Sequence, residues 1–572
     1  MKIVLTAINA KYIHSNLAVY SLRAYAKPYR EEITIAEYTI NQQLDDILMD
    51  LYKKRPDILC FSCYIWNFSY VEELVREAAK IFPNIPVWLG GPEVSYDAAD
   101  VLSRLPEVTG VMMGEGEETF LELLDFYHQQ GNGLTDIKGI AYRNADGGIC
   151  QNEWRKPIDL SEVPFVYQDM EGFKNKIIYY ESSRGCPFSC SYCLSSVDKC
   201  LRFRDLELVK KELQFFIDEG VPQIKFVDRT FNCNHKHAME IWSYLMEHDK
   251  GITNFHFEVA ADLLNEAEIQ LVENMRPGLI QLEIGVQSTN EETIREIKRT
   301  MKFSEVERIV KRINQRGNVH QHLDLIAGLP YEGIESFQKS FDDVYRLQPE
   351  QLQLGFLKVL KGSYMEEKKM DYGLVYKSKP PYEVLYTNWL SYEDVLALKS
   401  VEEMVEVYYN SGQFTYTLRN LEKEFDSAFE MYQELGKHYE KHELHLMSHA
   451  RITRYEILLD FIKELNTGKN ALYRELLTFD LYLRENVKNR PEFAGEYKVT
   501  KEMLNDFYET EAENHYYLKG YDQYDKKQLR KMTHMEKFHH DVAGTGEEKE
   551  VIILFDYENR NKLTHQATVF YV

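Results

Sequence analysis

The sequence lacks a hydrophobic run of membrane-spanning length and has too few basic residues to balance its acidic ones. No stretch reaches the roughly 18 apolar residues that a membrane span requires, and the start, MKIVLTAINAKYIHSN, has no secretory signal pattern. Lys and Arg total 68 against 92 Asp and Glu, so the formal net charge is −24. Such a chain has no general attraction for phosphate backbones. We therefore expect a cytoplasmic protein without a membrane or bulk nucleic acid as partner.

Cysteine is also scarce, with 8 residues in 572. In a reducing compartment so few thiols do not predict a disulfide framework, and clustered ones indicate metal or redox chemistry instead. The length predicts two to four domains, and 44% hydrophobic residues are enough to fill their cores.

The first region, residues 1–135, alternates short apolar strands with amphipathic helical segments. This alternation predicts an α/β fold with a doubly wound parallel sheet, in which ligands bind beyond the carboxyl ends of the strands. The expected strands are residues 3–7, 33–38, 57–65, 86–90 and 110–113.

Three further regions follow. Residues 136–175 are expected to form a hairpin and a linker, because turn residues 144–148 separate two short strand patterns. Residues 176–365 repeat the strand–helix alternation six times, which predicts a (βα)6 partial barrel. Residues 366–572 are expected to be a mostly helical domain that ends in a hairpin near residues 559–561. The barrel strands are expected at residues 177–180, 223–227, 255–259, 279–286, 322–326 and 352–360.

Three cysteines, Cys186, Cys190 and Cys193, follow directly on the first strand of the second series. Thiolates at this spacing can bind three corners of an iron–sulfur cube and leave the fourth iron open to a substrate. A structural zinc site with Cys200 as fourth ligand is the alternative, but the second CxxC-like half of such a site is missing. Cys60 and Cys63 are expected to be buried apolar residues, since in a strand they point to opposite faces.

The CxxxCxxC spacing, the tyrosine before the last cysteine and the position after a barrel strand resemble the radical S-adenosylmethionine (SAM) superfamily. The resemblance covers residues 176–365. It implies that Cys186, Cys190 and Cys193 hold a [4Fe–4S] cluster, whose fourth iron binds SAM and cleaves it to a 5′-deoxyadenosyl radical. It also implies that Tyr192 lies beside the adenine of SAM. Polar groups of SAM would be bound by residues at later strand ends, Asp228, Glu258 and Gln287. Each of these three can instead cap a helix or pair with a neighbour.

The N-terminal sheet resembles the cobalamin-binding domains that precede many radical SAM domains. Ser62 lies 28 residues before Gly90, as the family spacing requires, but no DxHxxG histidine that would ligate cobalt occurs near position 17. His14 lies close by and could be a shifted cobalt ligand, but its more ordinary role is that of a loop histidine that hydrogen-bonds backbone. A mononucleotide is a weaker alternative, because neither GxGxxG nor GxxxxGK[ST] is present. The resemblance implies cobalamin contacts from Asn16, Ser62, Gly90, Gly91, Glu93, Gly114, Glu115 and Glu117.

Together these features predict a cobalamin-dependent radical SAM enzyme, most often a C-methylase in this branch, supplied with electrons by a flavodoxin or ferredoxin. The alternatives are a cobalamin-dependent rearrangement or cyclisation without methyl transfer, a methylthiotransferase, and a non-catalytic cobalamin or redox sensor. Cys60, Cys63 and Cys150 do not match the extra cluster site of methylthiotransferases. The C-terminal region resembles an accessory domain of unassigned role, and its His534, His539 and His540 are expected at a solvated helix end. No residue pattern identifies the substrate.

Overall fold

The computed structural model describes residues 1–131, 133–197, 199–495 and 497–572. The chain divides into two compact units. The first contains residues 1–313, 326–333 and 356–392, and the second contains residues 314–325, 334–355 and 393–572.

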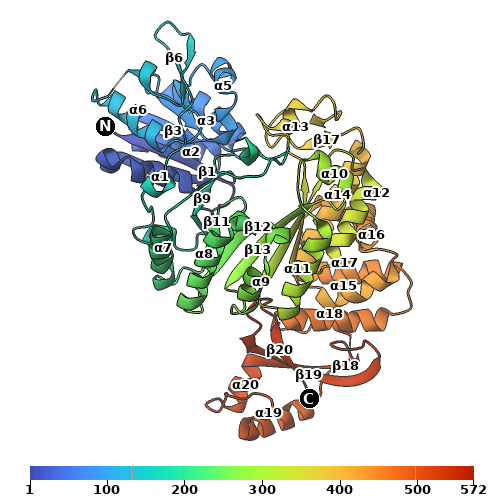
Figure 1. The fold of residues 1–572 in the computed structure, drawn as a ribbon. Coiled ribbons are helices and arrows are strands. Elements are labelled where there is room, and N and C mark those ends of the chain that lie inside the picture. Colours follow the sequence, from blue (N-terminus) through green and yellow to red (C-terminus); the bar gives the residue numbers. More distant parts are fainter. Residues whose placement is uncertain (132, 198, 496) are drawn as a thin grey trace. The chain divides into compact units, whose positions relative to one another are not determined.

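A seven-stranded sheet forms the start of the first unit, in the order β2-β1-β3-β4-β5-β6-β7 (Figure 1). Its first five strands pair in parallel, which confirms the doubly wound arrangement. These strands are β1 (Ile3–Asn9), β2 (Ile33–Thr39), β3 (Ile58–Ser62), β4 (Val87–Gly90) and β5 (Gly110–Met112).

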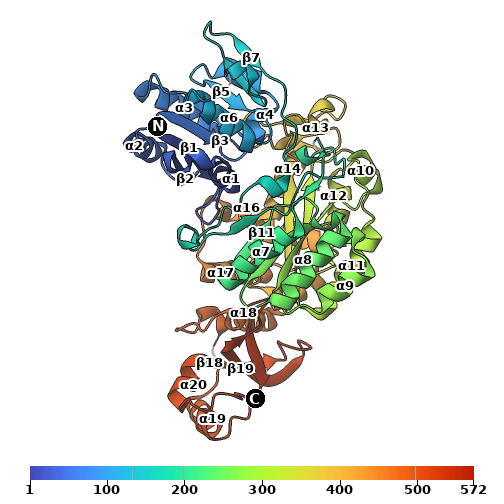
Figure 2. The same cartoon turned by 60° about the vertical axis from the view of Figure 1, so that its left-hand side comes forward.

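Helices cover both faces of this sheet (Figure 2). One face packs on α1 (Leu17–Tyr25) and α6 (Glu117–Tyr127), and the other on α2 (Leu44–Lys54), α3 (Phe68–Ile81) and α5 (Ala98–Arg104). Because both faces are buried, β1 and β3 are apolar at nearly every position rather than at every second one.

The hairpin expected in the linker extends this sheet. β6 (Ile140–Arg143) pairs antiparallel with β5, and β7 (Ile149–Gln151) pairs antiparallel with β6. Ile140 and Ala141 are fully buried, so the hairpin shares the core of the N-terminal sheet. The division at residue 135 stays a prediction.

The second sheet has six strands in chain order, β8-β11-β12-β13-β14-β15, which confirms the (βα)6 partial barrel. The strands are β8 (Ile178–Tyr180), β11 (Gln223–Phe226), β12 (Asn254–Val259), β13 (Ile280–Gln287), β14 (His320–Ala327) and β15 (Gln351–Phe356). The helices between them are α7 (Leu206–Asp218), α8 (His235–His248), α9 (Glu266–Glu273), α10 (Glu291–Glu296), α11 (Phe303–Arg316) and α12 (Ile334–Tyr345).

The C-terminal part of the second unit is mostly helical, as expected, with one antiparallel sheet in the order β18-β19-β20. Asp480 in the middle of α18 accepts hydrogen bonds from the first amides of α15, at Tyr416 and Thr417. This contact fixes the two helices to each other. The elements are α14 (Tyr392–Met404), α15 (Thr415–Leu421), α16 (Ala428–Lys441), α17 (Arg451–Glu464), α18 (Asn470–Arg484), α19 (Lys501–Asn514), α20 (Lys526–Met532), β18 (Thr533–His540), β19 (Glu548–Arg560) and β20 (Ala567–Tyr571).

The expected helix end at residues 533–540 is wrong. These residues form β18, whose Met535 and Phe538 are buried and which pairs with β19 along its length. Polar histidines at 534, 539 and 540 made the segment look like a solvated helix end, so the alternation of buried positions that is typical of a strand was not recognised. Among the described residues, no helix combines the length and the apolar character needed to cross a membrane.

Candidate functional site

The three clustered cysteines lie on a loop held closed by a short strand pair. β9 (Ser183–Arg184) enters the loop and pairs antiparallel with β10 (Arg202–Phe203), which leaves it. Gly185 opens the loop at φ 93°, and a Cβ there would lie 2.6 Å from the Cys200 carbonyl oxygen. Glycine is therefore required at the point where the chain turns into the cysteine segment.

The loop presents Cys186, Cys190 and Cys193 together. A turn joins the amide of Cys193 to the carbonyl of Cys190 at 3.1 Å. Burial raises the pKa of the Cys186 thiol, and the other two cysteines raise it further, while Phe188 and Thr230 lower it by hydrogen bonds. Three cysteines without a second CxxC-like pair suit three corners of an iron–sulfur cube better than a four-ligand zinc site.

Asp228 anchors the strand that leads into the loop. Its carboxylate accepts hydrogen bonds from the Ser182 amide (3.0 Å), the Ser182 hydroxyl (2.6 Å) and the Ser183 hydroxyl (2.6 Å). The side chain is 1% exposed, and this burial raises its pKa to about 6. The structure thus gives Asp228 a positioning role, and its contact with SAM stays a prediction.

Arg299 lies beside the cysteines and was missed by the sequence analysis. Its Nη1 is 3.2 Å from the Tyr192 hydroxyl and 3.9 Å from the Cys190 Sγ, and its Nη2 donates to the Gly285 carbonyl. A lone arginine after a short helix carries no recognisable motif, so only the fold reveals this position.

Gln287 and Arg299 both pack over Gly285. A Cβ at Gly285 would lie 2.3 Å from the Gln287 Nε2 and 3.5 Å from the Arg299 Nη2. Gln287 itself adopts φ 70° at the end of β13. Glycine at 285 therefore makes room for two polar side chains next to Tyr192.

Three buried polar atoms in this region have no hydrogen-bond partner: the Gln287 Oε1, the Arg299 Nε and the Ser191 Oγ. Buried polar atoms are rarely left unpaired, because each costs free energy unless a partner is supplied. A ligand with both donors and acceptors, such as SAM, fits this set of atoms. Gln287 and Tyr192 thus lie where SAM is expected, although their contacts with it stay predictions.

Glu258 belongs to a charged strip across β11, β12 and β13. It is in register with Glu283. The Glu283 Oε2 lies 2.8 Å from the Lys225 ammonium and 2.9 Å from the His256 Nε2. Burial opposes ionisation of Glu283, but the bonds from His256 and Lys225 outweigh it and lower the pKa of that carboxyl. Polar residues at alternating positions of these barrel strands were the sequence pattern from which this charged strip could have been predicted.

The carboxyl end of the N-terminal sheet brings together several predicted cobalamin contacts. The Asn16 Nδ2 lies 3.5 Å from the Ser62 Oγ. Ser62 is in register with Gly90, and a Cβ at Gly91 would lie 2.4 Å from the Cys63 carbonyl oxygen. Gly114 has φ 74° and donates its amide to Ser95. The glycines thus allow close backbone packing at the strand ends, where ligands of such sheets bind.

The three predicted glutamates contact basic residues of the barrel segment. Glu115 pairs with Arg202 at 2.6 Å and Glu117 with Arg184 at 2.9 Å. Glu93 pairs with Lys361 at 3.1 Å. These ion pairs join the loops of the N-terminal sheet to the barrel segment, and the contacts of the three glutamates with cobalamin stay predictions.

Large apolar side chains lie exposed on the loops of the same sheet, which the sequence analysis did not include. Tyr12 is 71% and Trp66 is 44% exposed, and the Trp66 ring stacks on Tyr64 at 4.3 Å. Trp154 lies over Gly114, within 3.3 Å of where its Cβ would be. Exposed aromatic side chains on these loops can cover the apolar faces of a flat macrocycle such as a corrin. The His14 Nδ1 bonds the side-chain hydroxyl of Tyr179 at 2.7 Å rather than a backbone group, and its role at cobalt stays untested.

Cys60 and Cys63 are fully buried on opposite faces of the N-terminal sheet, as expected. They share no site with each other, which removes the basis for a second cluster on this pair.

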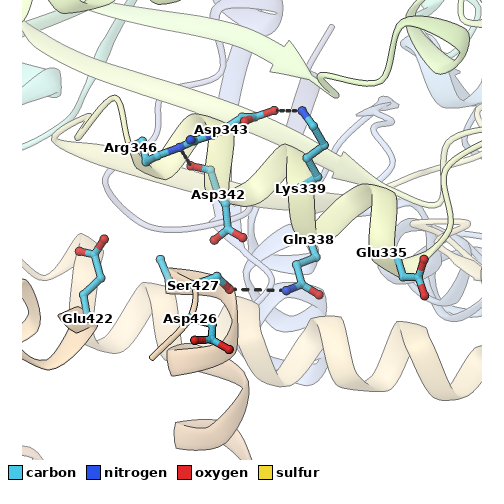
Figure 3. Close-up of a pocket in the computed structure, with 10 residues that line it drawn as sticks. Glu335, Gln338, Lys339, Asp342, Asp343, Arg346, Glu422, Asp426 and Ser427 are labelled. Atoms are coloured by element: carbon cyan, nitrogen blue, oxygen red, sulfur yellow. Dashed lines mark hydrogen bonds and ion pairs between the residues drawn. The ribbon is translucent and has the colours of Figure 1, made fainter. Parts of the chain in front are cut away.

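Two hollows lie away from the cysteine loop. In the second unit, a cavity of about 480 Å³ separates α12 from the start of α16 (Figure 3). Its lining includes Asp342, Glu422 and Asp426, and the Ser427 Oγ lies 3.5 Å from the Gln338 Nε2. In the first unit, a hollow of about 270 Å³ lies between α1 and the segment near Phe173. Neither hollow contains a residue predicted to bind a cofactor.

Three known families match successive segments of the chain. A B12 binding domain matches residues 3–124, the radical SAM superfamily matches residues 180–344, and a protein of unknown function (DUF4080) matches residues 370–555. The order agrees with the N-terminal sheet, the barrel and the accessory region described above.

The chain is also similar to known proteins and to solved structures. The chain is 29% identical over 280 residues to an uncharacterized methyltransferase, PH0819, of Pyrococcus horikoshii, covering 45% of this chain and 60% of that protein. It is 25% identical over 302 residues to the cobalamin-dependent radical SAM methyltransferase TokK of Streptomyces tokunonensis, covering 50% and 44%. The matches thus span less than two thirds of either relative. The structure of the cobalamin-dependent SAM radical enzyme OxsB, with aqua-cobalamin and SAM bound, superposes with TM-score 0.59 at 15% identity, covering 91% of this chain and 82% of that one.

Proposed function

We propose that this chain, which carries a B12-binding domain, a radical SAM domain and a DUF4080 domain in that order, is a cobalamin-dependent radical SAM methyltransferase. The observation that carries the proposal is the convergence of three thiols on one loop after the first barrel strand. The carboxyl end of the N-terminal sheet is joined to the flanks of that loop through the Arg184 and Arg202 ion pairs.

The residues of the chain hold, orient and shield the cofactors. Cys186, Cys190 and Cys193 would ligate the [4Fe–4S] cluster, and Asp228 fixes the strand from which their loop departs. Arg299, with its buried donor, would bind and orient the polar end of SAM together with Gln287. When bound, the cluster and SAM supply one-electron cleavage to a carbon radical, and cobalamin supplies a methyl carrier.

The Arg184–Glu117 and Arg202–Glu115 pairs keep the loops of the N-terminal sheet beside the cysteine loop. Each of these four side chains is at most 21% exposed, so the pairs are partly shielded from screening by salt. Their part in the proposed reaction is to hold two cofactor sites next to each other, since a methyl group has to pass between them.

Anaerobically reconstituted full-length protein, incubated with SAM and dithionite, tests the radical reaction. We expect 5′-deoxyadenosine from the wild type and none from a Cys186→Ser variant. A protein with a full cluster that releases no 5′-deoxyadenosine contradicts the proposal.

Formation of S-adenosylhomocysteine separates methyl transfer from cyclisation or rearrangement. A methylase consumes a second SAM as methyl donor, so both products are expected when cobalamin is present. 5′-Deoxyadenosine alone, with cobalamin bound, would favour the cyclisation alternative.

We propose a small molecule or a peptide as substrate, and a flavodoxin or ferredoxin as electron donor in the cytoplasm. The charge balance of −24 weighs against a nucleic-acid substrate.

A further inference from the structure

Four histidines lie within one short segment of the second unit, at positions 438, 442, 445 and 449, out of 17 in the chain. The first two are four residues apart at the end of α16, so their side chains lie on the same face of the helix. A pair of histidines at this spacing is the helical arrangement that binds zinc in known metal sites.

A carboxylate completes the group. The Glu464 Oε2 lies 3.2 Å from the His438 Nδ1, and the Glu464 Oε1 lies 2.9 Å from the His442 Nε2. The ligand atoms of the three residues all lie within 4.8 Å of one another. Two imidazole nitrogens and one carboxylate oxygen thus converge on one point, which is the donor set of many three-residue zinc sites.

The environment admits a cation. His438 is buried and packs edge-on against Phe461, whereas His442 and Glu464 are each 40% exposed, so an ion can reach the group from solvent. Both α16 and α17 end here, at Lys441 and Glu464. The carboxyl ends of two helices carry partial negative charge, which favours a cation between them.

The Lys441 ammonium also contacts this carboxylate and lies 3.1 Å from the Glu464 Oε2. Lys441 is 63% exposed, so its side chain can move into solvent without loss of packing. The exposed ion pair between Lys441 and Glu464 is therefore weak, so Lys441 competes only weakly with a metal ion for the carboxylate.

We propose that His438, His442 and Glu464 bind a divalent transition-metal ion, zinc in the first instance, which joins the end of α16 to the end of α17. Two nitrogen donors and one oxygen donor suit zinc. Magnesium and calcium prefer sites made of oxygen donors only, so this site does not suit them. Three protein ligands leave a fourth position for water. This site is independent of the cysteine loop and of the proposed methyl transfer.

Equilibrium dialysis of the full-length protein, with its iron–sulfur cluster assembled, against buffered free zinc tests the proposal. We expect one zinc ion more per chain in the wild type than in His442→Ala or Glu464→Gln, whose zinc dissociation constant rises by roughly tenfold or more. His248→Ala, which removes an exposed histidine from the end of α8, is the matched control and retains the wild-type zinc content. Equal zinc content in wild type and His442→Ala overturns the proposal.

A Lys441→Ala variant tests the same site without removing a ligand. Loss of the competing ammonium should tighten zinc binding by about two- to fivefold, the value of an exposed ion pair. Unchanged or weaker binding contradicts the proposed ligand set. X-ray absorption at the zinc edge should show nitrogen and oxygen neighbours, and a sulfur shell on the extra zinc would overturn the assignment.

Discussion

Two cysteine-bearing segments of the first unit have similar spacings and opposite surroundings. Cys60 and Cys63 lie at the end of a regular strand, where burial raises the pKa of Cys60 to about 12 and each thiol enters a different core. Cys186, Cys190 and Cys193 lie on an irregular loop, where the backbone brings all three side chains together. Spacing therefore indicates metal chemistry only where the local backbone lets the thiols converge.

The largest effect on iron content and SAM cleavage is expected when single thiols are removed from the loop. Cys186→Ser, Cys190→Ser or Cys193→Ser should each abolish the [4Fe–4S] signal in EPR and reduce SAM cleavage to background. A hydroxyl is a poor iron ligand beside a thiolate.

Cys200→Ser is the matched control for this prediction, since Cys200 lies near the end of the same loop and is exposed. It should keep full iron content. Loss of the cluster in Cys200→Ser would instead support the four-cysteine alternative.

The backbone of the loop can be tested through Gly185. Gly185→Ala would force φ 93° on alanine and place its Cβ against the Cys200 carbonyl, costing about 1–3 kcal/mol. We expect reduced iron content after reconstitution, measured against protein concentration. Gly147→Ala has a similar φ of 82° with no atom within 4 Å of the added Cβ, and should reconstitute normally. Equal loss in both variants would show that crowding at Cys200 is irrelevant.

Arg299 distinguishes the cysteine loop further, because its guanidinium lies 3.9 Å from the Cys190 Sγ and 3.2 Å from the Tyr192 hydroxyl. Arg299→Gln should weaken SAM binding about tenfold, or ~1.4 kcal/mol, by removing charge-assisted hydrogen bonds. The measurement is a SAM titration followed by the change in the EPR spectrum of the reduced cluster. Arg308→Gln, which breaks an exposed pair with Glu305 on α11, should bind SAM as the wild type does. An unchanged affinity in Arg299→Gln contradicts this role.

The smallest effect is expected from a substitution in β3, and it concerns stability rather than iron content. Cys60→Ala leaves a small cavity in a sealed core and should lower the free energy of unfolding by about 1 kcal/mol. Chemical denaturation measures this loss, and iron content should stay unchanged. A change in iron content would mean that the strand thiol takes part in cluster chemistry after all.

The sequence predicted most of both sheets, because apolar runs bounded by turn residues carry their own signal in α/β folds. It also predicted the three clustered cysteines, whose spacing is local. Arg299 and the Lys225–Glu283 pair could not be predicted, since the interacting residues are far apart in the sequence.

One error has a physical reason as well. The strand at 533–540 alternates buried and exposed positions, but its histidines resemble a polar helix end. Glu93, Glu115 and Glu117 stay predicted cobalamin contacts, and the fold pairs them with Lys361, Arg202 and Arg184, which the sequence did not predict. Ion-pair partners far apart in the sequence leave no local pattern.

Mössbauer spectroscopy of the iron-reconstituted protein, recorded with and without SAM, tests the central claim most directly. If three thiols hold a cube with one open corner, a single iron site of four should change its spectrum when SAM binds. Four iron sites that do not respond to SAM, or no four-iron cluster in protein with all three cysteines intact, would contradict the account.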